Sequence, residues 1–343
     1  MDGFRQYIQW LGSHAGSDHE SIFTLSNNRW RFHLVTRVSL IGLLVILIFG
    51  CNISVPSPVP PAPVSETPTL PASTPIPPSS TPAPDYLSRL RNAEYQLADS
   101  QRPVQLTDGQ FQEGTAGQAD YVSVNIGNFT AAGDLNGDGV DEVAAVFGEN
   151  YGGSGTFVFL AIYSDVNGKL TFLTSAFVGD RSVLNGLSIE NGEVALSAVT
   201  HAADDPLCCP TMQTHRHYSL VAENQLQMID FSSLTPDGQP RTITIESPVH
   251  GEQVDNAIQM KGSVTIAPFE NNLVYRVFST GEVELASGSI MVTAAEMGGP
   301  GTFDSIIALG NILSGAVVRV EIQDLSAADG SLLAMDSVEL VVK

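Results

Sequence analysis

The chain has 343 residues and a formal net charge of −22, with 37 acidic against 15 basic side chains. A surface of this sign repels phosphate backbones, so the composition argues against nucleic-acid binding. Its three cysteines are too few for the disulfide framework of a small secreted domain, and its length allows about two ordinary domains.

A largely apolar run near the beginning of the chain predicts export. Arg37 precedes this run, Val38–Phe49, which is followed by a glycine and Cys51. The run fits the core of a secretion signal, roughly 7–15 residues, and is shorter than the about 20 residues of a spanning helix. The segment Ile48–Cys51 resembles a bacterial lipobox, which implies that residues 1–50 are a leader and that Cys51 carries a lipid anchor to the cell membrane. The alternative is an uncleaved N-terminal signal anchor, which leaves the remainder on the same outer side.

The next segment has the composition of a linker. Residues 51–84 contain 12 of the 20 prolines of the chain, and serine, threonine, alanine and valine make up most of the rest. Such a sequence cannot build a core, and its prolines favour an extended polyproline II conformation. We therefore expect it to hold the folded parts away from the membrane surface.

The pattern of residues 85–235 predicts an antiparallel α+β domain with one N-terminal helix. Asp85 can cap this helix, and Leu87 and Leu90 share one of its faces. Beyond it, β-rich runs alternate with turn dipeptides such as Asn167-Gly168 and Asn191-Gly192, which are typical of hairpins. The expected strands are 121–129, 142–147, 156–163, 170–178 and 193–199.

A second breaker-rich junction, Ser233–Pro240, precedes a C-terminal segment that is β-patterned throughout. Its expected strands are 242–246, 258–264, 273–279, 282–287, 317–323 and 337–342. The stretches ITIESPVHGEQV, MKGSV, APFENNLVYRVFSTGEV, GPGTFDSII and VEIQDLSAADGS resemble the Gmad2 immunoglobulin-like domain of bacterial envelope proteins, first noted beside spore-germination modules. The resemblance covers nearly all of 241–343 and implies an immunoglobulin-like β-sandwich with a role in binding or adhesion. The family has no catalytic residues.

The loop Gly133–Glu142, GDLNGDGVDE, has the spacing of a calcium site. Oxygen ligands at alternate positions of a tight loop suit a hard cation such as Ca²⁺. The expected ligands are Asp134, Asn136, Asp138, the carbonyl of Val140, and Glu142. Position twelve, where an EF-hand has Glu, is Ala145, and the loop instead resembles the calcium loops of FG-GAP and integrin-type repeats. The alternative is a hairpin whose side chains cap their own backbone without metal.

A second group of residues that can bind metal lies in HAADDPLCCPTMQTHRH, which contains His201, Cys208, Cys209, His215 and His217. Adjacent cysteines rarely reach one ion together, and outside the cytoplasm they can form a vicinal disulfide. The sequence leaves three states open: a Cys208–Cys209 disulfide, two unlinked thiols, or a zinc or copper site that includes the histidines.

No assembled catalytic motif is present in the sequence. Tyr151–Thr156, YGGSGT, lacks the lysine of a phosphate-binding loop and is expected to be a turn. We therefore expect a membrane-anchored, non-catalytic binding or structural module, stabilised by calcium, with cell-wall polymer or other envelope proteins as partners. The alternative is an extracytoplasmic hydrolase or a metal sensor that uses the His201–His217 segment, where Asp204 and Asp205 could act as acid and base.

Overall fold

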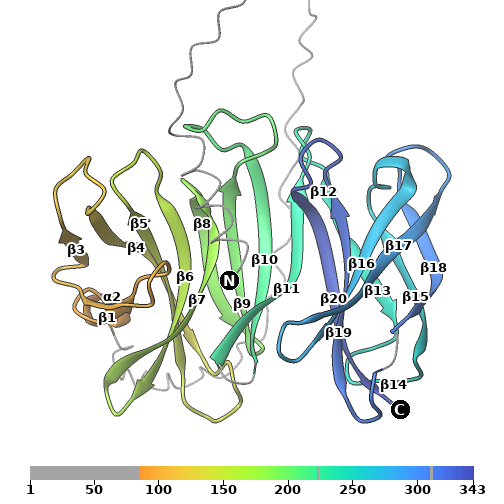
Figure 1. The fold of residues 1–343 in the computed structure, drawn as a ribbon, viewed down its shortest axis with the longest axis horizontal. Coiled ribbons are helices and arrows are strands. Elements are labelled where there is room, and N and C mark those ends of the chain that lie inside the picture. Colours follow the sequence, from red (N-terminus) through yellow and green to blue (C-terminus); the bar gives the residue numbers. More distant parts are fainter. Residues whose placement is uncertain (1–84, 222–223, 310–311) are drawn as a thin grey trace, which may run out of the picture. The chain divides into compact units, whose positions relative to one another are not determined.

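The computed structural model describes residues 85–343, except 222–223 and 310–311 (Figure 1). The predicted leader, the lipid attachment at Cys51 and the predicted linker lie outside the described residues. Over the described part the chain is mainly β, as predicted, and its sheets are antiparallel apart from the short parallel pair β14–β20. None of the helices in this part is long and apolar enough to cross a membrane.

A short cap and a five-stranded sheet open the fold. Asp85 caps the first helix, and one of its carboxylate oxygens accepts the backbone N–H of Ser88 at 3.1 Å. The cap consists of α2 (Tyr86–Leu90), β1 (Glu94–Gln96) and β2 (Pro103–Gln105). The sheet has the order β3-β4-β5-β6-β7 and comprises β3 (Gln110–Glu113), β4 (Val122–Gly133), β5 (Glu142–Asn150), β6 (Phe157–Val166) and β7 (Lys169–Asp180).

Two of the predicted Asn-Gly turns form hairpins, whereas Asn185-Gly186, also expected to be a turn, lies inside β8 (Val183–Glu190) at a register shift between Leu184 and Gly186. Asn167 and Gly168, between β6 and β7, have φ values of 54° and 81°. Asn191 and Gly192 connect β8 (Val183–Glu190) to β9 (Glu193–Thr200) with the same pair of values. Two consecutive positive φ angles match the right-handed twist of the flanking strands, and glycine and asparagine adopt them at low cost.

The five-stranded sheet is covered on both faces. Alternate residues of β5 divide between two cores: Val143, Ala145 and Phe147 pack under the cap, and Ala144 and Val146 face the opposite way. The opposite core is closed by β8 and β9 together with β10 (Met212–Val221) and β11 (Gln225–Leu234). Strands β8, β10 and β11 were not among the strands expected from the sequence, and in β8 the Asn185-Gly186 pair is typical of a turn.

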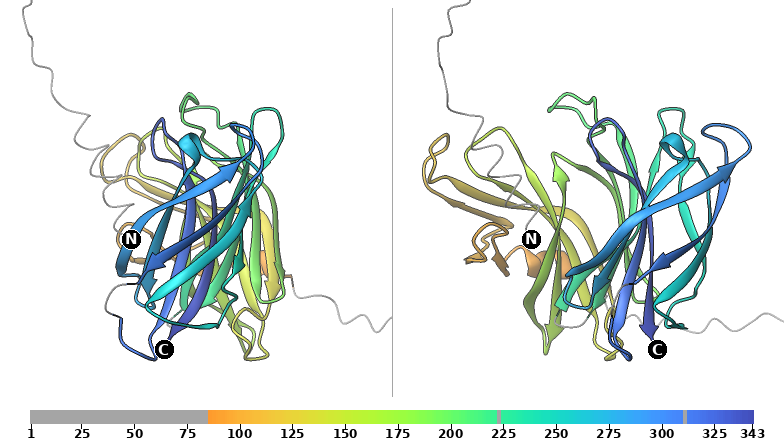
Figure 2. Two further views of the ribbon diagram at one scale, coloured as in Figure 1. Left: turned by 90° about the vertical axis from the view of Figure 1, so that its right-hand side faces the viewer. Right: turned by 45° about the vertical axis from the view of Figure 1, so that its right-hand side comes forward.

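The C-terminal part is the expected β-sandwich (Figures 1 and 2). One layer has the order β13-β15-β18-β17 and the other β17-β16-β19-β20. Strand β17 belongs to both layers, because its first part pairs with β16 and its last three residues pair with β18. The elements are β12 (Pro240–Arg241), β13 (Ile243–Ser247), β14 (Gln253–Val254), β15 (Ala257–Val264), η2 (Phe269–Asn271), β16 (Asn272–Ser279), β17 (Glu284–Ala294), β18 (Gly301–Ala308), β19 (Val317–Leu325) and β20 (Leu332–Val342).

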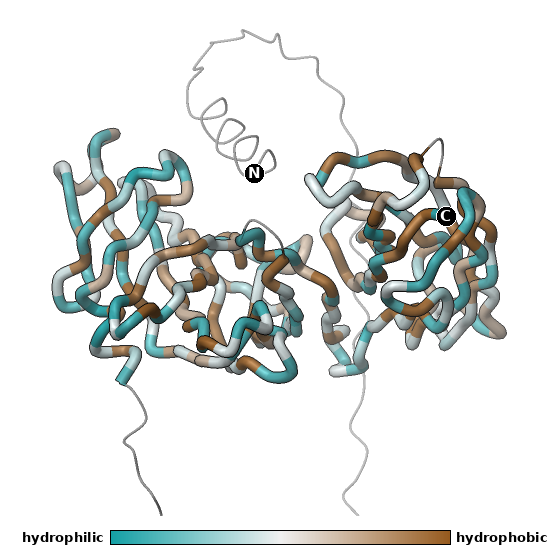
Figure 3. The backbone as a smooth tube through the Cα atoms, turned by 90° about the horizontal axis from the view of Figure 1, so that it is seen from below, coloured by the Kyte–Doolittle hydropathy of each residue, from teal (hydrophilic) through white to brown (hydrophobic). Residues whose placement is uncertain are grey.

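Backbone pairing joins the two β regions into one continuous sheet. Asp230 and Phe231 of β11 pair with Asp336 and Met335 of β20, so the sheet continues from β8 into the sandwich. Side chains add to the β11–β20 pairing, because Ser337 Oγ donates to the Ile229 carbonyl and Ser233 Oγ donates to the Leu333 carbonyl. Figure 3 shows hydrophobic and hydrophilic segments interleaved along the backbone. In β9 and β10 the buried residues alternate with more exposed ones, which is the pattern of sheets with one buried face.

Candidate functional site

The predicted calcium loop joins β4 to β5, and its side chains bond to its own backbone. The Asp134 carboxylate accepts the N–H groups of Gly137 and Gly139 at 2.7 and 2.8 Å. Asn136 Oδ1 accepts from Asp138 N at 2.9 Å, and Asp138 Oδ1 accepts from Val140 N at 2.7 Å. The pKa of Asp134 lies below its usual range, chiefly because Gly139 donates a hydrogen bond to the carboxylate. Desolvation opposes this shift, and the other N–H groups of the loop add to it.

Glu142 occupies the inner side of the same loop. Its side chain is buried and accepts from Leu135 N at 2.9 Å and from Asn136 Nδ2 at 3.2 Å. Burial, with smaller contributions from the charges of Asp138 and Asp134, raises the pKa of Glu142. A cation at this loop would offset that repulsion. The side chains offer oxygen atoms, which are the ligands that Ca²⁺ takes, but no three Asp, Glu, His or Cys side chains of the described residues are arranged to hold a metal.

The His/Cys segment forms the loop between β9 and β10 together with the start of β10. The Sγ atoms of Cys208 and Cys209 lie 2.28 Å apart as a vicinal disulfide. His215 and His217 lie on β10, where they bond to Ser197 Oγ at 2.8 Å and to Glu193 at 3.3 Å. Among the described residues, the histidines and cysteines of this segment form no metal-binding group.

Asp205, considered above as an acid or base, holds this loop closed. It accepts from Ala202 N at 2.8 Å, from Thr211 N at 2.7 Å and from Thr211 Oγ1 at 2.8 Å. The hydrogen bond from Ala202 lowers the pKa of Asp205. The hydrogen bonds from Thr211 add to this shift, and desolvation opposes it. The carboxylate is therefore occupied by structural contacts.

Arg181, which the sequence did not single out, connects two predicted loops. Its guanidinium donates to the Leu207 carbonyl at 2.7 Å and to the Ser154 carbonyl and hydroxyl, both at 3.1 Å. It also forms an ion pair with Asp180 at 2.5 Å. The glycine-rich turn and the disulfide loop are thus bonded to a single side chain that follows β7.

Glu149 is a fully buried carboxylate with a complete set of donors. Tyr95 donates its hydroxyl at 2.6 Å, Ala98 donates its backbone N–H at 3.1 Å, and Tyr151 donates its hydroxyl. Burial raises the pKa of Glu149, and these donors oppose the shift. Because every contact is internal, the group anchors the cap to β5 rather than facing a ligand.

A cleft of about 430 Å³ lies at the joint of the two β regions. Its walls come from β9, β10, β11, β19 and β20 and from the loop that carries His250. The charged or polar side chains of its lining include Glu193, His217, Gln227, Asp230, His250, Arg319, Asp336 and Glu339. The volume lies in the range of small-molecule sites.

Two carboxylates dominate the electrostatics of this cleft. Asp230 and Asp336 are direct partners across the β11–β20 pair. Burial, followed by the charge of Asp336, raises the pKa of Asp230 to about 6. Burial also raises the pKa of Asp336, against hydrogen bonds from the backbone N–H groups of Ile245 and Ser337. The chain therefore holds two acidic groups close together where the two β regions meet.

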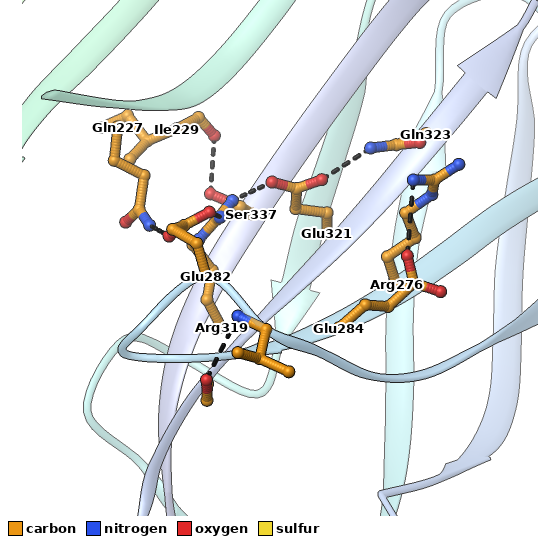
Figure 4. Close-up of polar contacts among 11 residues, drawn as sticks. Gln227, Ile229, Arg276, Glu282, Glu284, Arg319, Glu321, Gln323 and Ser337 are labelled. Atoms are coloured by element: carbon orange, nitrogen blue, oxygen red, sulfur yellow. Dashed lines mark hydrogen bonds and ion pairs between the residues drawn. The ribbon is translucent and has the colours of Figure 1, made fainter. Parts of the chain in front are cut away.

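A polar network beside the cleft fixes the joint (Figure 4). Arg319 forms an ion pair with Glu282 at 2.7 Å and another with Glu321, and Gln227 Nε2 donates to the same Glu282. Ser337 Oγ donates to the Ile229 carbonyl at 2.8 Å. Glu282 was expected to begin a strand, but it lies in the turn before β17 with a φ of 59°, from which it reaches both Arg319 and β11.

The raised pKa of Asp230 predicts a pH-dependent stability. Because the folded state binds this proton more tightly than the unfolded state, the contribution of Asp230 is greatest below about pH 4 and falls as the pH rises through about 6. We expect Asp230→Asn to remove this component, which is of the order of 1–3 kcal/mol. Urea denaturation of both proteins at pH 5 and pH 7.5 measures the difference, and equal pH slopes would contradict the assignment.

Comparison with known families identifies the C-terminal region. A search of curated proteins finds no match to the chain. Residues 242–331 match the family model of Gmad2, the immunoglobulin-like domain of bacterial spore germination. This domain belongs to a non-catalytic fold class, which suggests a binding or structural module. The sandwich that follows β12 is therefore a Gmad2 immunoglobulin-like domain, as the sequence motifs predicted.

Proposed function

We propose that the chain is a membrane-anchored, non-catalytic binding or structural module of the bacterial cell envelope. The observation that carries the proposal is the β11–β20 pairing, which joins the Gmad2 domain to a second β region and places a polar cleft at the joint. This pairing keeps the Gmad2 domain and the preceding β region in one orientation, which a binding site built from both regions requires. The partners we propose are cell-wall polymer or other envelope proteins, and a germination-related immunoglobulin-like domain is compatible with an extracellular location.

Sedimentation tests the binding role. The full chain in detergent is mixed with purified cell-wall polymer and centrifuged, and envelope extract is passed over the immobilised chain in parallel. We expect retention on the polymer or of a defined envelope protein, with β-sheet circular dichroism confirming that the chain is folded. If the folded chain neither sediments with the polymer nor retains an envelope protein, the binding role is refuted.

A variant of Cys51 tests the predicted lipid anchor. Lipidation adds about 0.8 kcal/mol of membrane affinity per buried CH₂, so Cys51→Ser is expected to move the protein from the membrane to the soluble fraction. Cell fractionation with immunoblotting measures the shift, and Cys208→Ser is the matched control that should stay with the membrane. Retention of Cys51→Ser on the membrane would favour the uncleaved signal anchor instead.

We further propose that Ca²⁺ binds Asp134, Asn136, Asp138, the Val140 carbonyl and Glu142. The support is a set of oxygen donors at alternate positions, with a partly desolvated carboxylate beside two others. Because a ligand that binds only the folded state stabilises it, EDTA is expected to lower the Tm of the full chain by several degrees.

Variants of two neighbouring acidic residues make this prediction specific. Asp134→Ala is expected to abolish the EDTA effect, whereas Asp141→Ala, in the same loop but outside the alternating positions, should retain it. Differential scanning calorimetry with and without EDTA gives both shifts. If EDTA does not change the Tm of the unmodified chain, the loop is a metal-free capped turn.

A further inference from the structure

Arg216 of β10 is a buried cation without a carboxylate partner. Its side chain belongs to a residue that is only 8% exposed, and none of the ion pairs among the described residues includes it. A charge that is removed from water and left unpaired costs stability. The folded chain would therefore be stabilised by a bound group that neutralises this guanidinium.

Two contacts hold the guanidinium and leave one of its edges free. Nη1 of Arg216 donates to the Val178 carbonyl at 2.7 Å, and Cζ lies over the Phe231 ring, 5.2 Å from its centroid. Nε is buried and has no acceptor. Nη2 also has no hydrogen-bond partner among the described residues, but it is not fully buried, so this edge reaches the surface at one end. An Nε–Nη2 edge carries two parallel N–H donors, the geometry that binds a carboxylate or phosphate through two oxygens.

The contact of Arg216 with β7 lies at a β-bulge. Gly179 pairs with Val158 of β6, but Phe177 pairs with the next residue of β6, so Val178 between them has no partner in that strand. Arg216 donates to the carbonyl of this extra residue. The bulge thus explains why the buried face of β10 carries an arginine at this position.

Two unpaired hydroxyl groups lie at the same bulge. A Cβ on Gly179 would lie 2.4 Å from Ser182 Oγ and 3.7 Å from Thr200 Cγ2, so both side chains pack against this residue. Ser182 Oγ and Thr200 Oγ1 are buried atoms without a hydrogen-bond partner, and Thr200 is only 6% exposed. Thr200 and Arg216 lie on the same buried face of the β9–β10 pair. Buried polar groups are normally paired, so three unpaired ones at one bulge indicate a missing partner.

We propose that the Nε–Nη2 edge of Arg216 binds a small oxyanion, a carboxylate or phosphate group, with Thr200 and Ser182 as further donors. The guanidinium supplies the positive charge and the paired N–H groups, and each hydroxyl can donate one O–H. A metal cation would be repelled by Arg216. Water could accept from the same donors, but it would leave the charge without compensation. The site is separate from the calcium loop, from the cleft at the β11–β20 joint and from the Gmad2 domain.

Isothermal titration of the full chain in detergent, at constant ionic strength, tests the proposal. The probes are the sodium salts of acetate, inorganic phosphate and chloride. We expect saturable binding of acetate or phosphate, about tenfold tighter than that of chloride, because chloride cannot accept from the two N–H groups through separate oxygens. Acetate against phosphate shows which oxyanion the site prefers. This comparison uses one unaltered protein and does not depend on how variants fold.

Matched variants assign the binding to the bulge. Arg216→Lys keeps the charge but removes the paired donors, so it should weaken the oxyanion by about tenfold while chloride changes little. Thr200→Val, which keeps the shape of the side chain, should weaken it by a smaller factor. Arg276→Lys, at an exposed arginine of the sandwich, should leave the affinity unchanged. Far-UV circular dichroism verifies that each variant is folded, and if Arg216→Lys does not fold, Thr200→Val and the unaltered protein decide.

Two results would overturn the proposal. If no probe binds, or if chloride binds as tightly as both oxyanions, the Arg216 edge is satisfied by water alone. If oxyanion binding is unchanged in folded Arg216→Lys and Thr200→Val, the anion binds elsewhere on the chain. Neither result bears on sedimentation with cell-wall polymer, so the proposed module function is decided separately.

Discussion

Arg241→Ala is expected to lower the free energy of unfolding by about 3–5 kcal/mol, because it leaves a buried charge without a partner. Arg241 pairs with Asp324 at 2.7 Å, and Asp324 is only 2% exposed. Burial already raises the pKa of Asp324, and Arg241 opposes that shift. Without the guanidinium the carboxyl must either protonate or remain as an unpaired charge. Urea denaturation followed by far-UV circular dichroism measures the loss.

The surface pair Arg276–Glu284 supplies the matched control. Its atoms lie 3.4 Å apart, and its side chains are 42% and 40% exposed. Arg276→Ala should therefore cost less than about 1 kcal/mol. Adding Asp324→Asn to Arg241→Ala should recover part of the loss, because the buried charge is then gone. If Arg241→Ala and Arg276→Ala lower the free energy of unfolding by similar amounts, the buried Arg241–Asp324 pair stabilises the fold no more than the exposed pair does.

Phe147→Ala is expected to destabilise the first β region by about 3–5 kcal/mol, the usual cost of emptying a buried aromatic site. Phe147 is fully buried in β5, and its ring stacks on Tyr95 of the cap with 4.5 Å between centroids. The cavity would separate the cap from the sheet. We therefore expect earlier loss of β-sheet signal in urea and faster proteolysis at the cap.

Phe269→Ala is the control, because its side chain in the loop before β16 is 67% exposed. Removing it should change stability by no more than about 0.5 kcal/mol. The same urea titration serves both variants. If Phe147→Ala lost no more stability than Phe269→Ala, the core between cap and sheet would not support this region.

Local chemistry explains which features could be predicted. The helix cap at Asp85 and the hairpin at Asn167-Gly168 depend on residues within a few positions of one another, so their sequence signals are complete. The Gmad2 motifs likewise lie in one continuous stretch, and the match at 242–331 confirms the resemblance. The calcium ligands and the lipid on Cys51 stay predictions, because they concern groups bound to the chain rather than its fold.

Long-range pairing explains which features could not. Strand β11 pairs with β20 about a hundred residues later, and no pattern within either segment indicates this contact. Arg181 likewise joins two loops that no local pattern connects.

The amino-acid sequence by itself determined the β-rich class, the turns, the immunoglobulin-like C-terminal domain and the acidic charge, because each follows from neighbouring residues or from composition. Only the tertiary structure decided that Asp230 meets Asp336, that Arg319 is committed to Glu282 and Glu321, and that a cleft opens beside them. The reason is physical: strand register and burial set which charges become neighbours, and both arise only when distant segments pack.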